Sequence, residues 1–166
     1  MILTKEVILN YIKRGKITIK PFNYKNLGAV SVDLTLDDKF GIFKNKPITI
    51  EENTNYKDYI NIVRKKSLIL KPKEMILAIT KERITLNDKI CGWIQGRSRF
   101  ARLGLLVHIS ASFIQPGINN KQVLEIVNLN NKPIRLKAGV KIAQIIFEKL
   151  EGRASYEGKF KNRVDF

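Results

Sequence analysis

The chain has 166 residues, of which 44% are hydrophobic and 28% charged, and its formal net charge is +16. This length and composition exclude a disordered chain and predict one soluble domain, residues 1–166, that can bury a core without metal or disulfide cross-links. The charge favours polyanions such as nucleoside polyphosphates, nucleic acid or anionic lipid, or simply lysines that solvate exposed faces.

Cysteine content and hydropathy restrict the cellular setting. The only cysteine, Cys91, rules out an intrachain disulfide and lies in an apolar run, where a buried structural thiol is expected. No apolar stretch approaches the roughly 20 residues of a membrane-spanning helix, and the first residues do not have a signal-peptide layout. We therefore predict a cytoplasmic protein with no membrane partner.

The first predicted element is a helix over residues 5 to 14, capped by Thr4 and ended by Gly15. From residue 17 onward, apolar and polar residues alternate as they do in β-strands. Such β-rich runs lie at residues 30–36, 39–43, 60–64, 67–70, 75–80, 89–95, 105–110, 122–129, 133–136 and 140–149. Many short strands at close spacing predict a mainly β protein of the sandwich, jelly-roll or barrel type.

Two segments do not have the pattern of either element. Residues 44–59 are polar with scattered aromatics, which indicates a long surface connection. Residues 152–166 could form neither an amphipathic helix nor a regular strand. We expect this tail to be either frayed or ordered by something that it covers.

The residues that are missing exclude several kinds of chemistry. One histidine and one cysteine cannot supply the ligands of a zinc-dependent nucleobase deaminase, so deamination would have to proceed without zinc. Neither a Gly-x-Ser-x-Gly elbow nor a P-loop is present. The single histidine, His108, is interpreted as a hydrogen-bonded core residue rather than a base.

Three arginines and a serine stand between two glycines in the segment Gly96–Gly104. The guanidinium groups of Arg97, Arg99 and Arg102 can make charge-assisted, often bidentate hydrogen bonds to phosphate oxygens. Glycine allows the backbone to approach a ligand closely. We therefore interpret this segment as a phosphate-binding turn.

Glu125 is a lone carboxylate in an otherwise apolar strand. Its side chain is expected to point the same way as Val123 and Val127, with Leu124 and Ile126 on the opposite face, so that both faces are buried. A buried carboxylate is normally paired, protonated or functional, because burying an unpaired charge costs several kcal/mol. Burial would raise its pKa into the range useful for a general base, and a nearby arginine would lower it. The alternative is an edge strand on which Glu125 faces water.

Taken together, the motifs resemble the dCTP deaminase branch of the dUTPase-like superfamily. The resemblance rests on five stretches and covers nearly the whole chain, more loosely over residues 37–85. The stretches are Gly96–Gly104, Val107–Ala111, Ile114–Gly117, Val123–Glu125 and Gly139–Phe147. The resemblance implies a distorted β-barrel or jelly roll with an N-terminal helix, assembled as a homotrimer with active sites between subunits.

The resemblance also implies an activity and a site. The reaction would be hydrolysis of dCTP to dUTP and ammonia, with Glu125 as general base, Ser98 and Arg102 positioning water and base, and Mg²⁺ carried by the triphosphate rather than held by the protein. Further nucleotide contacts would come from Arg97, Ser98, Arg99 and Arg102, from Ala111, Val123, Leu124 and Gln144, and from Tyr156, Lys159 and Arg163. The last three lie in the tail, residues 152–166, which would be flexible and close over the nucleotide.

Gln115 departs from the family pattern. Both branches usually carry an aspartate there, and in dUTPases this aspartate activates water for attack on the α-phosphate. An amide cannot act as that base, which argues against dUTP diphosphatase activity, alone or combined with deamination, and alters a sugar contact.

Two alternatives therefore remain beside deamination of dCTP. One is dUTP diphosphatase or a bifunctional enzyme, and the other is a basic, non-catalytic β-barrel that binds nucleic acid. The scattered aromatic residues do not form an evident stacking platform, which argues against nucleic acid as the ligand.

Overall fold

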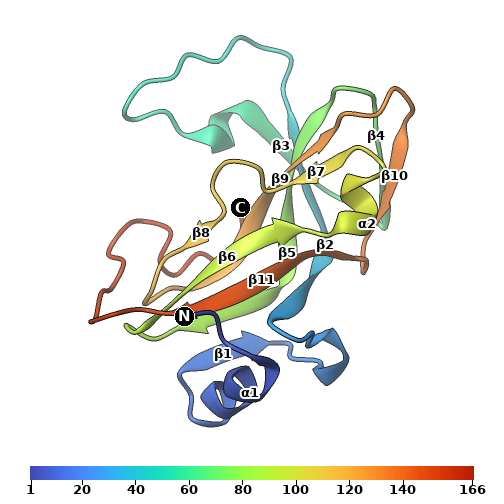
Figure 1. The fold of residues 1–166 in the computed structure, drawn as a ribbon. Coiled ribbons are helices and arrows are strands. Elements are labelled where there is room, and N and C mark those ends of the chain that lie inside the picture. Colours follow the sequence, from blue (N-terminus) through green and yellow to red (C-terminus); the bar gives the residue numbers. More distant parts are fainter.

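The computed structural model describes residues 1–166, and its main feature is a strongly curled β-sheet with a helix at one end (Figure 1). Fifteen elements follow one another along the chain. They are α1 (Lys5–Lys13), β1 (Ile17–Lys20), η1 (Tyr24–Asn26), β2 (Ser31–Phe43), η2 (Tyr56–Tyr59), β3 (Ile60–Arg64), β4 (Ser67–Leu70), β5 (Met75–Leu86), β6 (Ile90–Gly96), α2 (Ser98–Ala101), β7 (Leu105–Val107), β8 (Phe113–Ile114), β9 (Asn119–Asn128), β10 (Ile134–Lys137) and β11 (Lys141–Lys149). The predicted mainly β class with an N-terminal helix is confirmed.

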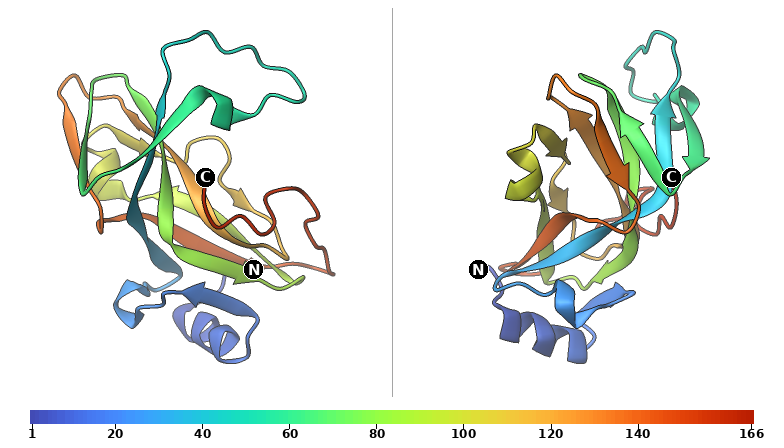
Figure 2. Two further views of the ribbon diagram at one scale, coloured as in Figure 1. Left: turned by 180° about the vertical axis from the view of Figure 1, so that it is seen from behind. Right: turned by 90° about the vertical axis from the view of Figure 1, so that its right-hand side faces the viewer.

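Nine strands form one sheet, in the order β7-β9-β5-β2-β11-β6-β8, with β1 paired to β5 and β3 paired to β2. The strands β4 and β10 form a separate antiparallel pair. The two further views show the sheet curling around itself, with α1 near one end and the connection 44–59 near the other (Figure 2). The sheet therefore encloses its apolar residues along the inside of the curl.

Strand β2 joins the two halves of the curl. Its first residues pair with β11, and its later residues pair with β5 and β3. The register with β5 shifts between Leu36 and Phe40, where Asp37 and Asp38 interrupt the apolar alternation. This interruption of the pattern explains why the sequence predicts two strands, at 30–36 and 39–43, where the structure has one continuous strand of 13 residues.

The helix agrees with the prediction, apart from its cap. It runs from Lys5 to Lys13, and Gly15 follows it at φ 67°, a backbone conformation that glycine adopts without strain. Thr4 has the extended backbone of an N-cap, but its side chain makes no capping hydrogen bond. Ile8 is fully buried against the sheet, so packing rather than capping holds the helix in place.

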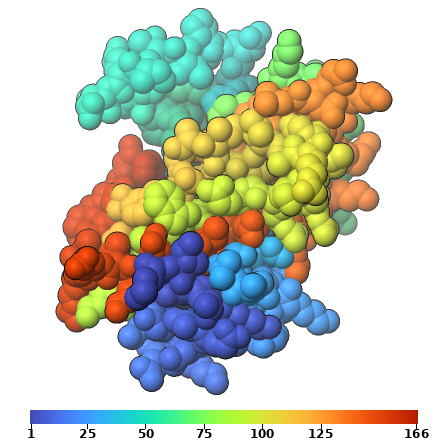
Figure 3. Space-filling model, in the orientation of Figure 1, coloured from blue at the N-terminus to red at the C-terminus, as the bar shows by residue number.

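The main core contains 27 buried hydrophobic residues, most of them from the inner face of the large sheet, with others from α1 and from the β4–β10 pair. Cys91 is free and buried, and burial raises the pKa of its thiol, as expected for a structural cysteine. None of the helices could span a bilayer, and α1 has only 9 residues. In the space-filling view, the connection 44–59 (teal) stands out at one end, and the tail (red) lies beside the yellow-orange segment that precedes β9 (Figure 3).

Candidate active site

A cavity of about 550 Å³ lies between β9, the segment from His108 to Ile118 and the tail. Its walls are largely apolar, with a few polar groups that converge on the interior, as in many small-molecule sites. Seventeen residues line it: Phe43, Tyr56, Met75, Leu77, His108, Ala111, Phe113, Ile114, Gln115, Ile118, Asn120, Gln122, Val123, Glu125, Tyr156, Phe160 and Arg163.

Glu125 is a wall residue of this cavity. Strand β9 lies between β5 and β7, so Glu125 is not on an edge strand. Leu124 and Ile126 are fully buried in the main core, as predicted, whereas the side chain of Glu125 is 26% exposed and the two valines beside it are half-buried. The expectation that both faces are buried is therefore wrong, because the second face borders the cavity.

His108 also lines the cavity, and its ring contacts the carboxylate of Glu125. Its Nδ1 atom lies 2.9 Å from Oε2 of Glu125, without the alignment of a linear hydrogen bond. The backbone N–H of His108 also donates to the carbonyl oxygen of Glu125 at 2.7 Å. The residue is buried as predicted, but the prediction that it is hydrogen-bonded is wrong, because neither ring nitrogen has a hydrogen-bond partner and the ring instead contacts the candidate base.

The backbone at His108 explains why the preceding strand is short. Strand β7 ends at Val107, although the sequence pattern predicts a strand to residue 110, because His108 has φ 58° and turns the chain away from the sheet. A non-glycine residue in this left-handed region is uncommon and carries some strain. This turn directs the imidazole toward the carboxylate of Glu125.

Opposing effects set the charge state of Glu125. Burial favours the neutral acid, but the contact with His108, a backbone N–H and the charge of Arg163 outweigh it and lower the pKa of Glu125 below its ordinary value. The group is therefore ionised at neutral pH. A carboxylate that is ionised, half-buried and open to a cavity can accept a proton from a bound water.

The tail forms another wall of the cavity. The carbonyl oxygens of Lys161 and Arg163 accept hydrogen bonds from the backbone of Asn119 and Lys121, each at 2.8 Å, so the tail runs beside the start of β9. Upstream, the N–H of Tyr156 donates to the carbonyl of Pro116 at 2.9 Å. The tail is thus ordered on its own chain, and its closure over a nucleotide stays a prediction.

Two glycines permit this close approach. Gly117 has φ 76°, and a Cβ there would lie 2.5 Å from Oγ of Ser155 in the tail. A Cβ at Gly158 would clash with the hydroxyl of Tyr156, whose ring folds back over the glycine. In the Tyr-Glu-Gly-Lys segment, residues 156–159, the glycine is therefore needed for the position of the tyrosine ring.

The predicted phosphate-binding segment lies elsewhere on the chain. After β6 it forms the short helix α2, rather than the expected turn, and Ser98, Arg99 and Arg102 are exposed on it. Arg97 is partly buried, with Nε 3.3 Å from Oδ1 of Asp33 and Nη1 donating to the carbonyl of Lys141 at 3.2 Å. None of these arginines lines the cavity that contains Glu125.

The other predicted site residues divide between the cavity and other places. Ala111, Gln115, Val123, Tyr156 and Arg163 line the cavity. The remaining three lie outside it. Leu124 has its side chain in the core, Gln144 accepts a hydrogen bond from Ser31 at 2.9 Å near Arg97, and Lys159 lies beside a second pocket with its Nζ atom 5.1 Å from the centre of the Phe160 ring.

Sequence reasoning missed several cavity residues. Tyr56 comes from η2 in the connection 44–59, for which the sequence indicates only a surface segment, and its buried hydroxyl has no hydrogen-bond partner. Asn120 and Gln122 are joined by a side-chain hydrogen bond, and the amide of Asn120 donates to the carbonyl of Phe160 at 2.7 Å. The available signal in the sequence was the presence of two amides, Asn120 and Gln122, at the start of an apolar strand, because buried amides need hydrogen-bond partners.

No three His, Cys, Asp or Glu side chains lie close enough together to hold a metal ion. The exposed cations of α2 can contact phosphate oxygens, but Asp33, the carboxylate near them, is already paired with Arg97 and Lys141. The donor set in this region therefore suits an anionic ligand.

Solved structures of known proteins show the same fold. The 2'-deoxycytidine 5'-triphosphate deaminase from Agrobacterium tumefaciens superposes with a TM-score of 0.71 at 18% identity over 88% of this chain. The present chain spans about half (47%) of that protein. A mutant dUTPase from phage phi11 of Staphylococcus aureus gives a TM-score of 0.53 at 11% identity, covering 86% of this chain and 96% of the phage protein. The fold is therefore that of the dUTPase-like proteins.

Sequence comparison identifies the branch. A model of the family described as "dCTP deaminase-like" matches residues 2–150. The dCTP deaminase of Pseudoalteromonas atlantica is 38% identical over 99% of this chain and 88% of its own length, and the "dCTP deaminase, dUMP-forming" of Methanosphaera stadtmanae is 38% identical over 89% and 78%. This chain belongs to the dCTP deaminase family, and the resemblance inferred from its motifs is confirmed.

Proposed function

We propose that this protein deaminates dCTP hydrolytically, giving dUTP and ammonia. The observation that carries the proposal is Glu125, an ionised carboxylate that faces a 550 Å³ cavity lined mostly by apolar side chains. The relatives named dCTP deaminase support the choice of substrate. The cavity supplies a place for a pyrimidine ring beside the group that would accept a proton.

In this reaction the oxygen of a bound water forms a bond to C4 of the cytosine ring. Glu125 takes the proton that the water loses. The C4–N4 bond then breaks, and Glu125 returns the proton to the departing amine, which leaves as ammonia. The second proton of the water ends on N3 of the ring, which leaves a carbonyl at C4 and gives dUTP. The contact with His108 helps to keep the Glu125 carboxylate ionised, and so able to accept this proton, because it lowers the pKa of Glu125.

The phosphates require a second surface. Arg97, Ser98, Arg99 and Arg102 lie on or beside α2, outside the cavity, so one chain by itself does not bring them to Glu125. We propose that α2 of a neighbouring subunit completes the site in a homotrimer, with Ser98 and Arg102 positioning the water and the base. Mg²⁺ would arrive with the triphosphate and neutralise part of its charge.

A second candidate is a bifunctional enzyme that also converts dUTP to dUMP. Several relatives at 34–38% identity are named "dCTP deaminase, dUMP-forming", which favours it. Gln115 argues against it, because this amide lies at the cavity wall and cannot act as a base for water. The two candidates differ in whether pyrophosphate is released.

One product assay separates them. The protein is incubated with Mg²⁺ and either dCTP or dUTP, nucleotides are separated by chromatography, and ammonia and pyrophosphate are measured. We expect equal amounts of dUTP and ammonia from dCTP, with no pyrophosphate. Release of dUMP from dUTP would contradict the interpretation of Gln115, and no ammonia from dCTP would contradict the proposed activity.

A further inference from the structure

We propose that Phe166, together with the ion pair between Lys39 and Asp165, anchors the tail across the cavity and so positions Arg163 in the wall of the cavity that contains Glu125. The attachment of the tail can be tested without assuming any activity. Only the expected effect of this attachment on turnover of dCTP rests on the proposed function. Phe166 would be a positioning residue, because it lies behind the cavity wall and does not line the cavity.

The aromatic ring of Phe166 occupies a pocket of its own. The residue is only 6% exposed and packs with Ile60, Leu77 and Ile79, a cluster separate from the main core. Gly41 lies against the same cluster, because a Cβ there would lie 2.9 Å from Ile60 and 3.3 Å from Leu77, and the Phe166 ring is in van der Waals range at 3.5 Å. Burial of a large apolar side chain at the end of an otherwise exposed segment is the arrangement expected of an anchor.

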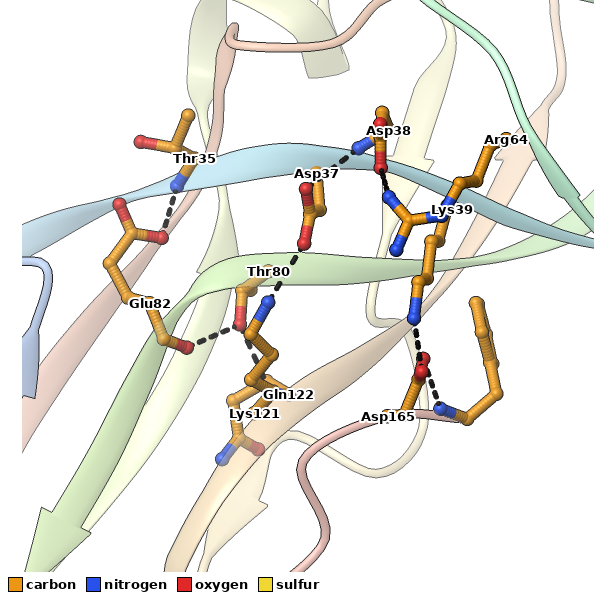
Figure 4. Close-up of polar contacts among 11 residues, drawn as sticks. Thr35, Asp37, Asp38, Lys39, Arg64, Thr80, Glu82, Lys121, Gln122 and Asp165 are labelled. Atoms are coloured by element: carbon orange, nitrogen blue, oxygen red, sulfur yellow. Dashed lines mark hydrogen bonds and ion pairs between the residues drawn. The ribbon is translucent and has the colours of Figure 1, made fainter.

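Charged residues of β2 reinforce this attachment (Figure 4). Lys39 pairs with Asp165 of the tail, and this contact lowers the pKa of the Asp165 carboxyl. Two residues earlier, Asp37 pairs with Lys121 of β9 at 2.8 Å. The same stretch of β2 therefore holds both the tail and the strand that the tail runs beside.

The anchor fixes the register of the residues before it. Arg163 is three positions from Phe166, its carbonyl accepts the N–H of Lys121, and its guanidinium donates to the carbonyl of Lys121 at 3.3 Å. The guanidinium also lies 5.0 Å from the centre of the Phe160 ring. From this position Arg163 lines the cavity and helps to lower the pKa of Glu125.

The separate cluster makes the proposal testable without unfolding the protein. Phe166 does not belong to the main core of 27 residues, so its loss leaves that core intact. Val164 provides a matched control, because it is an apolar residue of the same tail but is 53% exposed. Phe166→Leu tests whether another large apolar side chain can restore the attachment.

The first measurement is native trypsin cleavage after Lys161 and Arg163, followed by mass spectrometry. We expect Phe166→Ala to raise the cleavage rate in the tail about tenfold or more, because local opening exposes backbone that is now hydrogen-bonded to β9. Val164→Ala should be cleaved at the wild-type rate, and Phe166→Leu at an intermediate one. Cleavage of Phe166→Ala in the tail at the wild-type rate would overturn the anchor.

Should Phe166→Ala be cleaved throughout its sequence as an unfolded chain, Asp165→Asn decides the question. This change removes the charge that Lys39 holds at the protein surface and leaves the apolar cluster intact. Faster trypsin cleavage of Asp165→Asn than of the wild type, confined to the bonds after Lys161 and Arg163, supports the anchor. Cleavage of these bonds at the wild-type rate refutes it.

Steady-state kinetics with dCTP form the second measurement. A loosened tail should raise KM and lower kcat/KM about tenfold, with a smaller change in kcat, and Phe166→Leu should recover most of the loss. Absence of turnover in the wild type would refute the proposed function, while the cleavage result would still decide the anchor. Turnover with altered cleavage but unchanged KM and kcat/KM would remove the link between the anchor and the site.

Discussion

Glu82 is buried and Glu125 half-buried in neighbouring strands of the same sheet, β5 and β9, and their surroundings differ. Glu82 is 3% exposed, and its carboxylate accepts one hydrogen bond, from the backbone N–H of Thr35 at 2.8 Å (Figure 4). Glu125 borders a cavity that Arg163 also lines, and it contacts His108. Burial raises the pKa of Glu82, whereas charged and hydrogen-bonding partners lower that of Glu125 despite its burial.

The difference shows that depth of burial does not identify a functional carboxylate. Glu82 is the more deeply buried of the two, yet it does not line the cavity, and its role is to satisfy the backbone where β2 changes partners. Glu125 has partners that keep it ionised and an open space beside it. A carboxylate needs both features to exchange a proton with a bound ligand.

The largest expected effect separates the two residues by isosteric substitution. Glu125→Gln should lower kcat for deamination by about 10²- to 10⁴-fold, because an amide cannot accept the proton. Nucleotide binding, measured by calorimetry with dCTP, should change much less. Glu82→Gln serves as the matched control and should retain kcat within about threefold. Equal losses in both variants would mean that Glu125 acts through folding and not through chemistry.

A second prediction concerns where the partners of each glutamate come from. Glu82 has its contact within its own chain, whereas the proposed site of Glu125 also needs Arg102 of another subunit. Arg102→Ala and Glu125→Gln should each be inactive alone. After the two are unfolded, mixed in equal amounts and refolded, about one quarter of the sites should be intact, because each site combines residues from two neighbouring subunits of a closed ring. Absence of recovered activity would place the site within one chain.

The smallest expected effect concerns stability and pH. Since the pKa of Glu82 is raised in the folded protein, the folded state binds the proton more tightly than the unfolded chain does. The free energy of unfolding should therefore fall as pH rises from the ordinary carboxyl value of 4.5 toward the folded pKa. The loss is at most about 1.4 kcal/mol for each pH unit that separates the folded and unfolded pKa values.

Glu82→Gln removes this dependence, because its amide does not titrate. Urea unfolding of the wild type and the variant between about pH 4 and pH 8 should show the difference in unfolding free energy moving in favour of Glu82→Gln as pH rises. Parallel curves would show that the carboxyl of Glu82 titrates normally. The acidic residues with lowered pKa, such as Asp37, act in the opposite direction in both proteins and cancel in the comparison.

The local elements could largely be read from the sequence, because they depend on short-range periodicity. The helix begins at Lys5, and the strands predicted at 60–64 and 67–70 have the same bounds in the structure. Errors occur where tertiary contacts override the pattern. The sequence did not indicate that β2 continues through Asp37 and Asp38, or that β7 stops at His108, since both depend on pairing with distant strands and on an unusual backbone angle.

For the candidate site, too, some features could be predicted from the sequence and others only from the tertiary structure. The sequence alone showed a carboxylate, Glu125, in an apolar strand and a basic segment near residue 100, because both follow from residue type and local pattern. Its motifs were also sufficient to recognise the family. Only the tertiary structure decided that His108 contacts Glu125, that the tail forms a cavity wall, and that the arginines lie outside that cavity. The physical reason is that contacts between residues far apart in the chain depend on how the sheet curls, and no local pattern records that curvature.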